Sequence, residues 1–89
     1  MSRQAYNDVR TTDFTAGSGG VMTDEVGVVT GDLTLRTTVD EGGAVEQLVQ
    51  YQQADEWYHP AGALTALPEG GDIDAVHEAA VERMRRGER

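Results

Sequence analysis

The chain has 89 residues, of which 16 are acidic and seven are basic, and its formal net charge at pH 7 is -9. This length allows a single small domain, because domains usually contain about 50 to 250 residues. The absence of cysteine excludes a disulfide framework, a zinc site built on cysteines and thiol chemistry.

All seven basic residues are arginines, so no lysine offsets the acidic excess. Carboxylates at this density repel one another in dilute buffer, whereas about 1 M salt shortens the screening length to roughly 3 Å. We therefore interpret the composition as that of a protein from a salt-accumulating, halophilic cell. A GC-rich genome would also favour arginine over lysine, but it would not explain the excess of Asp and Glu.

The sequence has no apolar run near the roughly 18 residues of a membrane span, and no charged and then apolar leader at its N-terminus. We therefore expect a soluble, cytoplasmic protein that has no contact with a membrane. The lack of cysteine fits a reducing compartment.

The first 21 residues contain few large apolar side chains, chiefly Tyr6, Val9 and Phe14, and they end in a glycine-rich run. Such a segment buries too little to offset its ordering entropy unaided. We predict a flexible or partly ordered N-terminal tail over residues 1–21, which Tyr6 and Phe14 could anchor. One folded domain would follow over residues 22–89.

The clearest strand pattern covers residues 33–39, where side chains alternate between an apolar and a polar face. One face carries Leu33, Leu35, Thr37 and Val39, and the other carries Thr34, Arg36 and Thr38. The next four residues, Asp-Glu-Gly-Gly, supply the positive-φ positions of a tight reversal, so a returning strand should begin near Ala44. Residues 44–53 also fit a helix by their apolar spacing, but their length and flanking glycines favour the hairpin.

Two further strands are predicted on either side of this hairpin. Residues 26–30 form an apolar run that ends at a Gly-Asp pair. Residues 57–67 form a later run, which Pro60 and Gly62 interrupt, and proline restricts such a strand to an edge or a bulge.

A C-terminal helix is predicted from Asp72, a good N-cap, to about Arg86, with Gly87 placed to end it. Its apolar stripe consists of Ile73, Val76, Ala80 and Met84. The predicted fold class is therefore α+β, a small antiparallel sheet of three or four strands with one C-terminal helix packed on a face. Because so thin a core rarely supplies more than about 3 to 5 kcal/mol, we expect a homodimer formed through an edge strand or the helix.

Three groups of residues are candidates for function. Trp57, Tyr58 and His59 lie in the densest cluster of unusual residues, and tryptophan and tyrosine are enriched at binding hot spots. Because neighbouring strand residues face opposite ways, one of the two rings should be exposed or lie at a contact. This segment is the predicted interaction site, although the same rings could fill a small core.

The second group, Asp74, His77 and Glu78, is spaced for one helix face and could share a divalent ion, or could simply be an exposed polar face. The third group consists of the C-terminal arginines Arg83, Arg85, Arg86 and Arg89. These could contact nucleic acid, but pairing with the helix dipole and with the chain's own carboxylates explains them equally well.

The glycine-rich segments match neither a P-loop nor a dinucleotide fingerprint, and no nucleophile elbow is present, so no cofactor is expected. We predict a non-catalytic protein–protein interaction module that self-associates. The alternatives are a small transcription-associated protein that uses its C-terminal arginines, and a metal-dependent enzyme.

Overall fold

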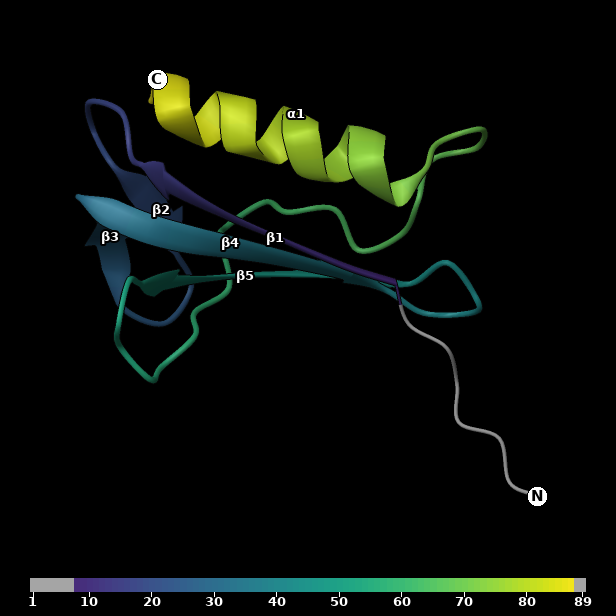
Figure 1. Cartoon of the computed structure of the whole chain (residues 1–89), viewed down its shortest axis with the longest axis horizontal. Coiled ribbons are helices and arrows are strands. Elements are labelled where there is room, and N and C mark those ends of the chain that lie inside the picture. The colour runs from purple at the N-terminus through teal and green to yellow at the C-terminus, as the bar shows by residue number, and fades with distance from the viewer. Residues whose placement is uncertain (1–7, 88–89) are drawn as a thin grey trace.

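The computed structural model of the chain describes residues 8–87 (Figure 1). Its elements, in chain order, are β1 (Asp8–Thr15), β2 (Val21–Thr23), β3 (Gly27–Val29), β4 (Asp32–Val39), β5 (Val45–Tyr51) and α1 (Ile73–Arg86). The three long strands form an antiparallel sheet in the order β1-β4-β5, and β2 pairs with β3 in a separate two-stranded sheet. The predicted α+β fold class is confirmed.

The helix α1 packs along one face of the three-stranded sheet, over β1 and β4 (Figure 1). The side chains of Leu33, Leu35 and Val49 point toward it and are fully buried. We call this side of the sheet the covered face. Among the described residues no helix lies on the opposite side, which carries Arg36 and Leu48 and which we call the open face.

Strand β1 corrects the prediction of a flexible tail, as far as the structure describes that region. Residues 8–15 pair with β4 along the whole length of both strands. Phe14 is 5% exposed and belongs to the main core. A full ladder of hydrogen bonds and one buried aromatic ring offset an ordering entropy that the segment could not offset alone. Tyr6 lies outside the described residues.

The predicted hairpin is confirmed as β4 and β5. The apolar face of β4 is buried as expected. In the turn, the Asp40 carboxylate accepts hydrogen bonds from the N–H groups of Gly42 and Ala44, both at 2.9 Å, and Gly43 takes a φ of 89°. The helix alternative for residues 44–53 is wrong, because this turn returns the chain directly into pairing with β4.

The predicted strand over residues 57–67 is not continuous. The segment touches the sheet at two isolated bridges, between Val49 and Tyr58 and between Ala44 and Ala66. Between them the chain leaves β5, because Pro60 cannot donate to a ladder and Gly62 adopts a φ of 75°.

The predicted strand over residues 26–30 is present as the short strand β3, and its partner β2 was not predicted. The two strands form a small hairpin in which the hydroxyl of Thr23 donates to the carbonyl of Gly27 at 2.6 Å. Thr23 is 3% exposed, so this hydroxyl needs an internal partner.

The predicted helix is confirmed with its caps. The Asp72 carboxylate accepts a 2.9 Å hydrogen bond from the N–H of Ala75, and Gly87 ends the helix with a φ of 82°. The buried stripe contains the four predicted residues together with His77 and Val81. Within residues 8–87 no helix is both long and apolar enough to cross a membrane.

The C-terminal end of α1 is held by the loop after β1. The N–H of Gly17 donates to the carbonyl of Met84 at 2.9 Å. A Cβ atom on Gly17 would lie 2.4 Å from backbone atoms of Arg85 and Gly87, so no larger residue fits there without moving the helix. This contact joins the helix to the strand that the sequence analysis had assigned to a tail.

Candidate functional site

The predicted interaction site, Trp57 to His59, runs beside the outer edge of β5. Tyr58 and Val49 exchange two backbone hydrogen bonds of 2.8 Å, so the segment alternates locally like a strand. Because successive side chains then point to opposite faces, Tyr58 packs against the core on the covered side, and its two neighbours point toward the open face. The three residues are therefore divided between the two faces.

Trp57 is half-buried on the open face beside Arg36. The guanidinium carbon of Arg36 lies 4.3 Å from the centroid of the indole ring, which is within the range of a cation–π interaction. Tyr58 is also half-buried, and its hydroxyl donates to Glu56 at 2.9 Å, which raises the pKa of Tyr58. Neither ring is fully exposed, because Arg36 stacks on one ring and the other packs against the core, and a role for either ring at a contact stays a prediction.

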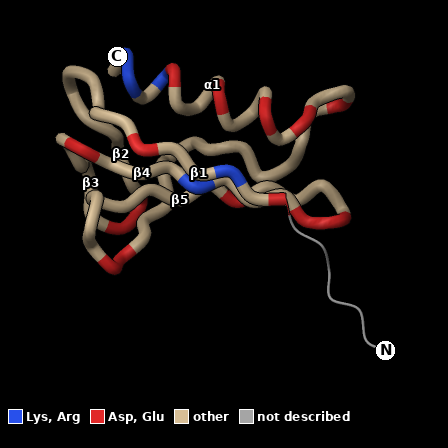
Figure 2. The backbone as a smooth tube through the Cα atoms, in the orientation of Figure 1, with Lys and Arg blue, Asp and Glu red and all other residues tan. Residues whose placement is uncertain are grey.

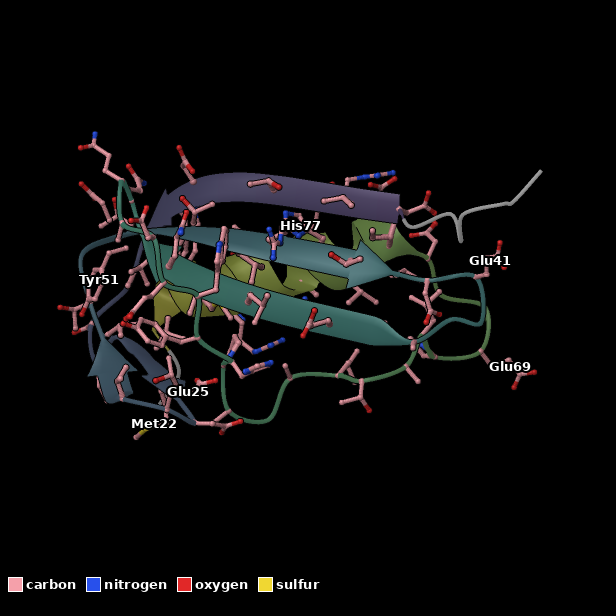
Figure 3. The ribbon with its side chains drawn as sticks, turned by 90° about the horizontal axis from the view of Figure 1, so that it is seen from below. Met22, Glu25, Glu41, Tyr51, Glu69 and His77 are labelled. Atoms are coloured by element: carbon pink, nitrogen blue, oxygen red, sulfur yellow. The ribbon has the colours of Figure 1, made fainter. Side chains whose placement is uncertain are left out.

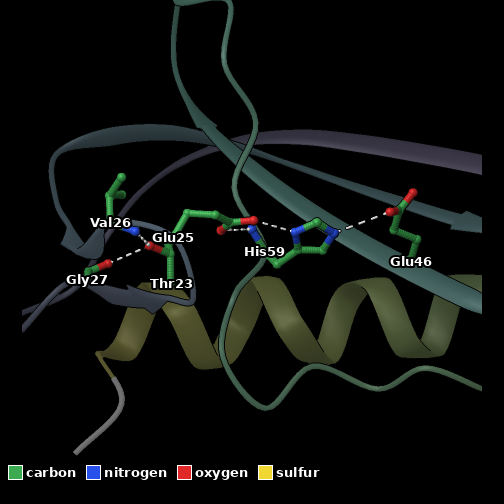
Figure 4. A network of polar contacts seen from close by, with 6 residues as sticks. All are labelled: Thr23, Glu25, Val26, Gly27, Glu46 and His59. Carbon is green, nitrogen blue, oxygen red and sulfur yellow. Dashed lines mark hydrogen bonds and ion pairs between the residues drawn. The ribbon is translucent and has the colours of Figure 1, made fainter.

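His59 connects three segments of the chain (Figure 4). Its backbone N–H donates to one carboxylate oxygen of Glu25 at 2.7 Å, and its Nδ1 lies 2.5 Å from the other oxygen. Its Nε2 lies 3.4 Å from the carboxylate of Glu46 on β5. The hydrogen bond to Glu25, and then that to Glu46, raise the pKa of His59, while His59 lowers the pKa of Glu25. The imidazole is half exposed, so water and salt screen this charge cluster.

His77 lies between the sheet and α1, near the middle of the strands (Figure 3). It is 5% exposed, and its Nε2 and Nδ1 lie 2.8 Å from the hydroxyls of Thr12 and Thr37 respectively. The side-chain amide of Gln47 donates to the Thr37 hydroxyl at 3.0 Å. These four residues form a buried polar network that joins the helix to all three strands, and its neutral groups suit an uncharged imidazole.

The environment of His77 disfavours its protonation. Burial is the largest effect and lowers the pKa of His77, and the nearby Arg10 lowers it further. The carboxylates of Glu78 and Asp74 act in the opposite direction but do not reverse the result. The ring is therefore built to stay neutral.

The predicted metal ligands Asp74, His77 and Glu78 do not share a site. Asp74 forms an ion pair with Arg10 at 2.5 Å, which lowers the pKa of Asp74. His77 points into the core, with both ring nitrogens bonded to threonines, and Glu78 is exposed. In the part of the chain that the structure describes, no group of three or more His, Asp or Glu side chains could hold a metal ion. Helical spacing alone predicted a shared metal site, but His77 belongs to the buried stripe of the helix.

The predicted nucleic-acid contacts lie at the end of α1, except that Arg89 is outside the described residues. Arg86 lies 3.6 Å from Glu82, one turn earlier, and Arg83 borders a groove beside the helix. Figure 2 shows acidic positions along the first part of the same helix and basic ones at its end. The arginines thus end a helix whose first half is acidic.

The outer edge of β1 is a feature that the sequence analysis missed. The N–H of Ala16 donates to the carbonyl of Gly31 at 2.9 Å and continues the β1–β4 ladder. Because hydrogen-bonding direction alternates along a strand, the odd-numbered residues of β1 turn their N–H and C=O groups away from β4. These residues are Val9, Thr11, Asp13 and Thr15. Within residues 8–87 no strand pairs with this edge.

A second missed feature is a groove of about 560 Å³ beside α1. We call it the Gln47 groove and define it by six of its lining residues. They are Gln47 of β5, Gly62 and Leu64 of the following loop, and Ala75, Ala79 and Arg83 of the helix. Glutamine on the buried face of a strand was the available sequence signal.

No protein-family model, curated protein sequence or solved structure matches this chain.

Proposed function

We propose that the protein is a non-catalytic protein–protein interaction module that self-associates through the outer edge of β1. The observation that carries this proposal is the eight-residue edge strand whose outward N–H and C=O groups have no partner strand among residues 8–87. An exposed edge of this kind is a ready template for pairing with another chain. A second copy offers the same edge, and the pairing would be isologous, as in most dimers.

The sequence of β1 fits antiparallel pairing with itself. For the faces of the two sheets to match, the two-fold axis must pass through a residue rather than between two residues. An axis at Thr11 or Thr12 places no like charges opposite each other, whereas an axis at Arg10 or Asp13 would pair that residue with its own copy. Two registers therefore join the strands without electrostatic conflict.

The helices favour the same arrangement. Strands lie about 4.8 Å apart, and α1 packs over β1 and β4, so two copies of α1 would run antiparallel about 10 Å apart. This is a usual distance for packed helices. Because Thr12 contacts His77, an axis at Thr11 or Thr12 would pass near the first half of both helices, which would lie alongside each other there.

The net charge makes this association dependent on salt. Two chains of -9 repel each other over a long range in dilute buffer, and the repulsion is largely screened near 1 M salt. A halophilic setting would therefore favour the dimer as well as the folded chain.

The two histidines support a non-catalytic role. His77 is enclosed by hydroxyl groups in the core, and His59 is held between two carboxylates. The segment from Trp57 to His59 lies beside β5, at the opposite edge of the sheet from β1. It would remain accessible to a further protein partner in the dimer.

The test is gel filtration with light scattering in 2 M NaCl. We expect twice the mass of one chain, and a lower dimer fraction in 0.1 M NaCl. The substitution Val9→Asp places a carboxylate on the pairing edge, and with the axis at Thr11 it lies opposite Asp13 of the other copy, so it should give a monomer. Val28→Asp in β3 is a matched control, because Val9 is 47% and Val28 48% exposed.

A second variant tests the backbone directly. Thr11→Pro removes an N–H group that points away from β4, so the fold should survive while edge pairing is lost. Circular dichroism checks the fold of each variant. A wild-type chain that is monomeric in 2 M NaCl, or a dimer that Val9→Asp and Thr11→Pro leave intact, would contradict the proposal.

A further inference from the structure

The backbone pairing along the outer edge of β5 has a gap of one residue. Val49 exchanges two hydrogen bonds with Tyr58, and the N–H of Val45 donates to the carbonyl of Thr65 at 2.9 Å. Gln47 lies between them, and by strand alternation its N–H and C=O groups point the same way as those of its two paired neighbours. Among the hydrogen bonds of residues 8–87, none involves the backbone N–H or C=O of Gln47.

The gap is held open by contacts elsewhere in the chain. The N–H of Asp24 donates to the carbonyl of His59, and the N–H of Ala61 donates to the carbonyl of Met22, both at 2.9 Å. Pro60 is buried where this loop meets Thr23. The β2–β3 hairpin therefore draws the loop away from β5, and the loop cannot close over Gln47 without breaking these bonds.

The Gln47 groove lies over this gap. Its walls are built from small side chains, with Ala75 and Ala79 on the helix and Gly62 on the loop. Its volume of about 560 Å³ falls within the 300 to 1,000 Å³ usual for small-molecule sites. A mostly apolar hollow with a few polar groups, here those of Gln47 and Arg83, matches the general composition of such sites.

Gln47 lines the groove and is held by hydrogen bonds of the buried polar network. It is 3% exposed, and its side-chain amide donates to Thr37, which in turn bonds to His77. A backbone donor and acceptor left without partners in so buried a position normally find one in a ligand or an ordered water. The buried polar network thus fixes the position of the unpaired groups.

We propose that the Gln47 groove binds a neutral small molecule with a compact apolar body and an amide edge, such as a lactam or a primary carboxamide. The C=O of such an edge would accept a hydrogen bond from the backbone N–H of Gln47, and its adjoining N–H would donate to the backbone C=O of Gln47. A small molecule fits better than an extended peptide, because the neighbouring residues Val45 and Val49 are already paired and a strand could not continue along β5. This inference does not depend on the dimer, which uses the other edge of the sheet.

The experiment is an amide NMR titration of the 15N-labelled chain in 2 M NaCl with ε-caprolactam, which has a seven-membered apolar ring and a cis amide. We expect saturable shifts of the Gln47, Gly62 and Ala79 signals. N-methylcaprolactam keeps the ring and the carbonyl but loses the donor, so it should bind about tenfold more weakly. Cyclohexanecarboxylate tests whether the nearby Arg83 selects an anion instead.

Variants locate the site. Ala79→Leu and, independently, Ala75→Leu fill the groove from exposed positions on the helix and should abolish the caprolactam shifts. Ala54→Leu adds the same bulk at an exposed loop position away from the groove and should leave the shifts unchanged.

Three results would overturn the proposal. They are the absence of saturable shifts with ε-caprolactam, equal affinity for its N-methyl derivative, and tighter binding of the carboxylate than of the lactam. Shifts that survive both groove-filling variants would place the binding elsewhere and would also overturn it.

Discussion

The two faces of the three-stranded sheet give similar side chains opposite environments, and the two histidines show this most clearly. On the covered face, His77 is bonded to two threonine hydroxyls, and burial lowers its pKa. On the open face, His59 lies between Glu25 and Glu46, which raise its pKa. Protonation of the same residue type is therefore disfavoured on one side of the sheet and favoured on the other.

This difference follows from what covers each face. Beneath α1, water is excluded, so a charge would lose its hydration and polar groups must bond to each other. On the open face the contacts involve charged side chains, as with Arg36 over Trp57 and His59 beside Glu25, and they remain in contact with solvent. The covered face stabilises the fold by burial, whereas charged side chains on the open face stay in contact with water and lose little hydration.

The largest expected difference between the faces concerns two leucines. Leu35 is fully buried under the helix, whereas Leu48 is 8% exposed on the open face. We expect Leu35→Ala to lower the free energy of unfolding by about 4 kcal/mol, because a dry core cannot collapse around the cavity. Leu48→Ala should cost about 2 kcal/mol, because neighbouring side chains and solvent can fill the space. Urea unfolding in 2 M NaCl measures both values.

The two substitutions control for each other, because they remove the same side-chain atoms from adjacent strands. Equal losses for the two variants would show that the open face is as tightly packed as the covered one. That result would indicate that a second layer covers it.

The next effect concerns the buried polar network. His77→Leu removes the shared partner of Thr12 and Thr37, so we expect a loss of about 2 kcal/mol, because each of these hydroxyl groups loses a hydrogen bond beneath the helix. The substitution should also remove a pH dependence. Because the unfolded chain binds a proton at His77 near its ordinary pKa of about 6.5 and the folded chain does not, the wild type should lose stability as pH falls below that value.

Urea unfolding of the wild type and of His77→Leu, compared between pH 7.5 and pH 5.5, tests this effect. Both curves contain the contributions of the carboxylates and of His59, so the difference between them isolates His77. A difference that stays constant with pH would show that the ring is not buried as a neutral base.

Much of the covered side of the molecule could be predicted from the sequence. The alternation from Leu33 to Val39, the turn after it and the capped helix are local patterns, and each appears at the expected place. Strand β1 was missed because its pattern is mostly threonine and charged residues, and its stability comes from pairing with β4 rather than from its own apolar content. Only Phe14 indicated the contact.

The candidate sites were less predictable, because they depend on partners distant in sequence. Helical spacing placed His77 beside two carboxylates, but it could not show that threonines on two strands would take both ring nitrogens. The alternation rule correctly separated Trp57 from Tyr58, but it could not reveal that Arg36, 21 positions earlier, stacks on the indole. The gap at Gln47 depends on a hairpin formed by residues 21–29 and on a proline far along the chain.

A smaller effect should come from the ion–aromatic contact on the open face. A double-mutant cycle with Arg36→Gln and Trp57→Leu should give a coupling of about 0.5 to 1 kcal/mol in the free energy of unfolding, which is typical of a cation–π pair near the surface. Urea unfolding again provides the measurement. A coupling indistinguishable from zero would show that the contact between Arg36 and the indole ring does not stabilise the fold.

The smallest effect should come from His59, and its sign should be opposite to that of His77. Because the folded chain holds the proton more tightly than the unfolded chain, the stability from His59 is fully present below about pH 6.5 and is lost as pH rises through the raised pKa. His59→Gln should therefore lower the melting temperature slightly at pH 5.5 and have less effect at pH 8.5. The difference should also shrink between 0.2 M and 2 M NaCl, because the imidazole and both carboxylates are exposed to screening ions. A larger loss at pH 8.5 than at pH 5.5 would mean that His59 is held as a neutral ring, and the contrast between the two faces would then fail.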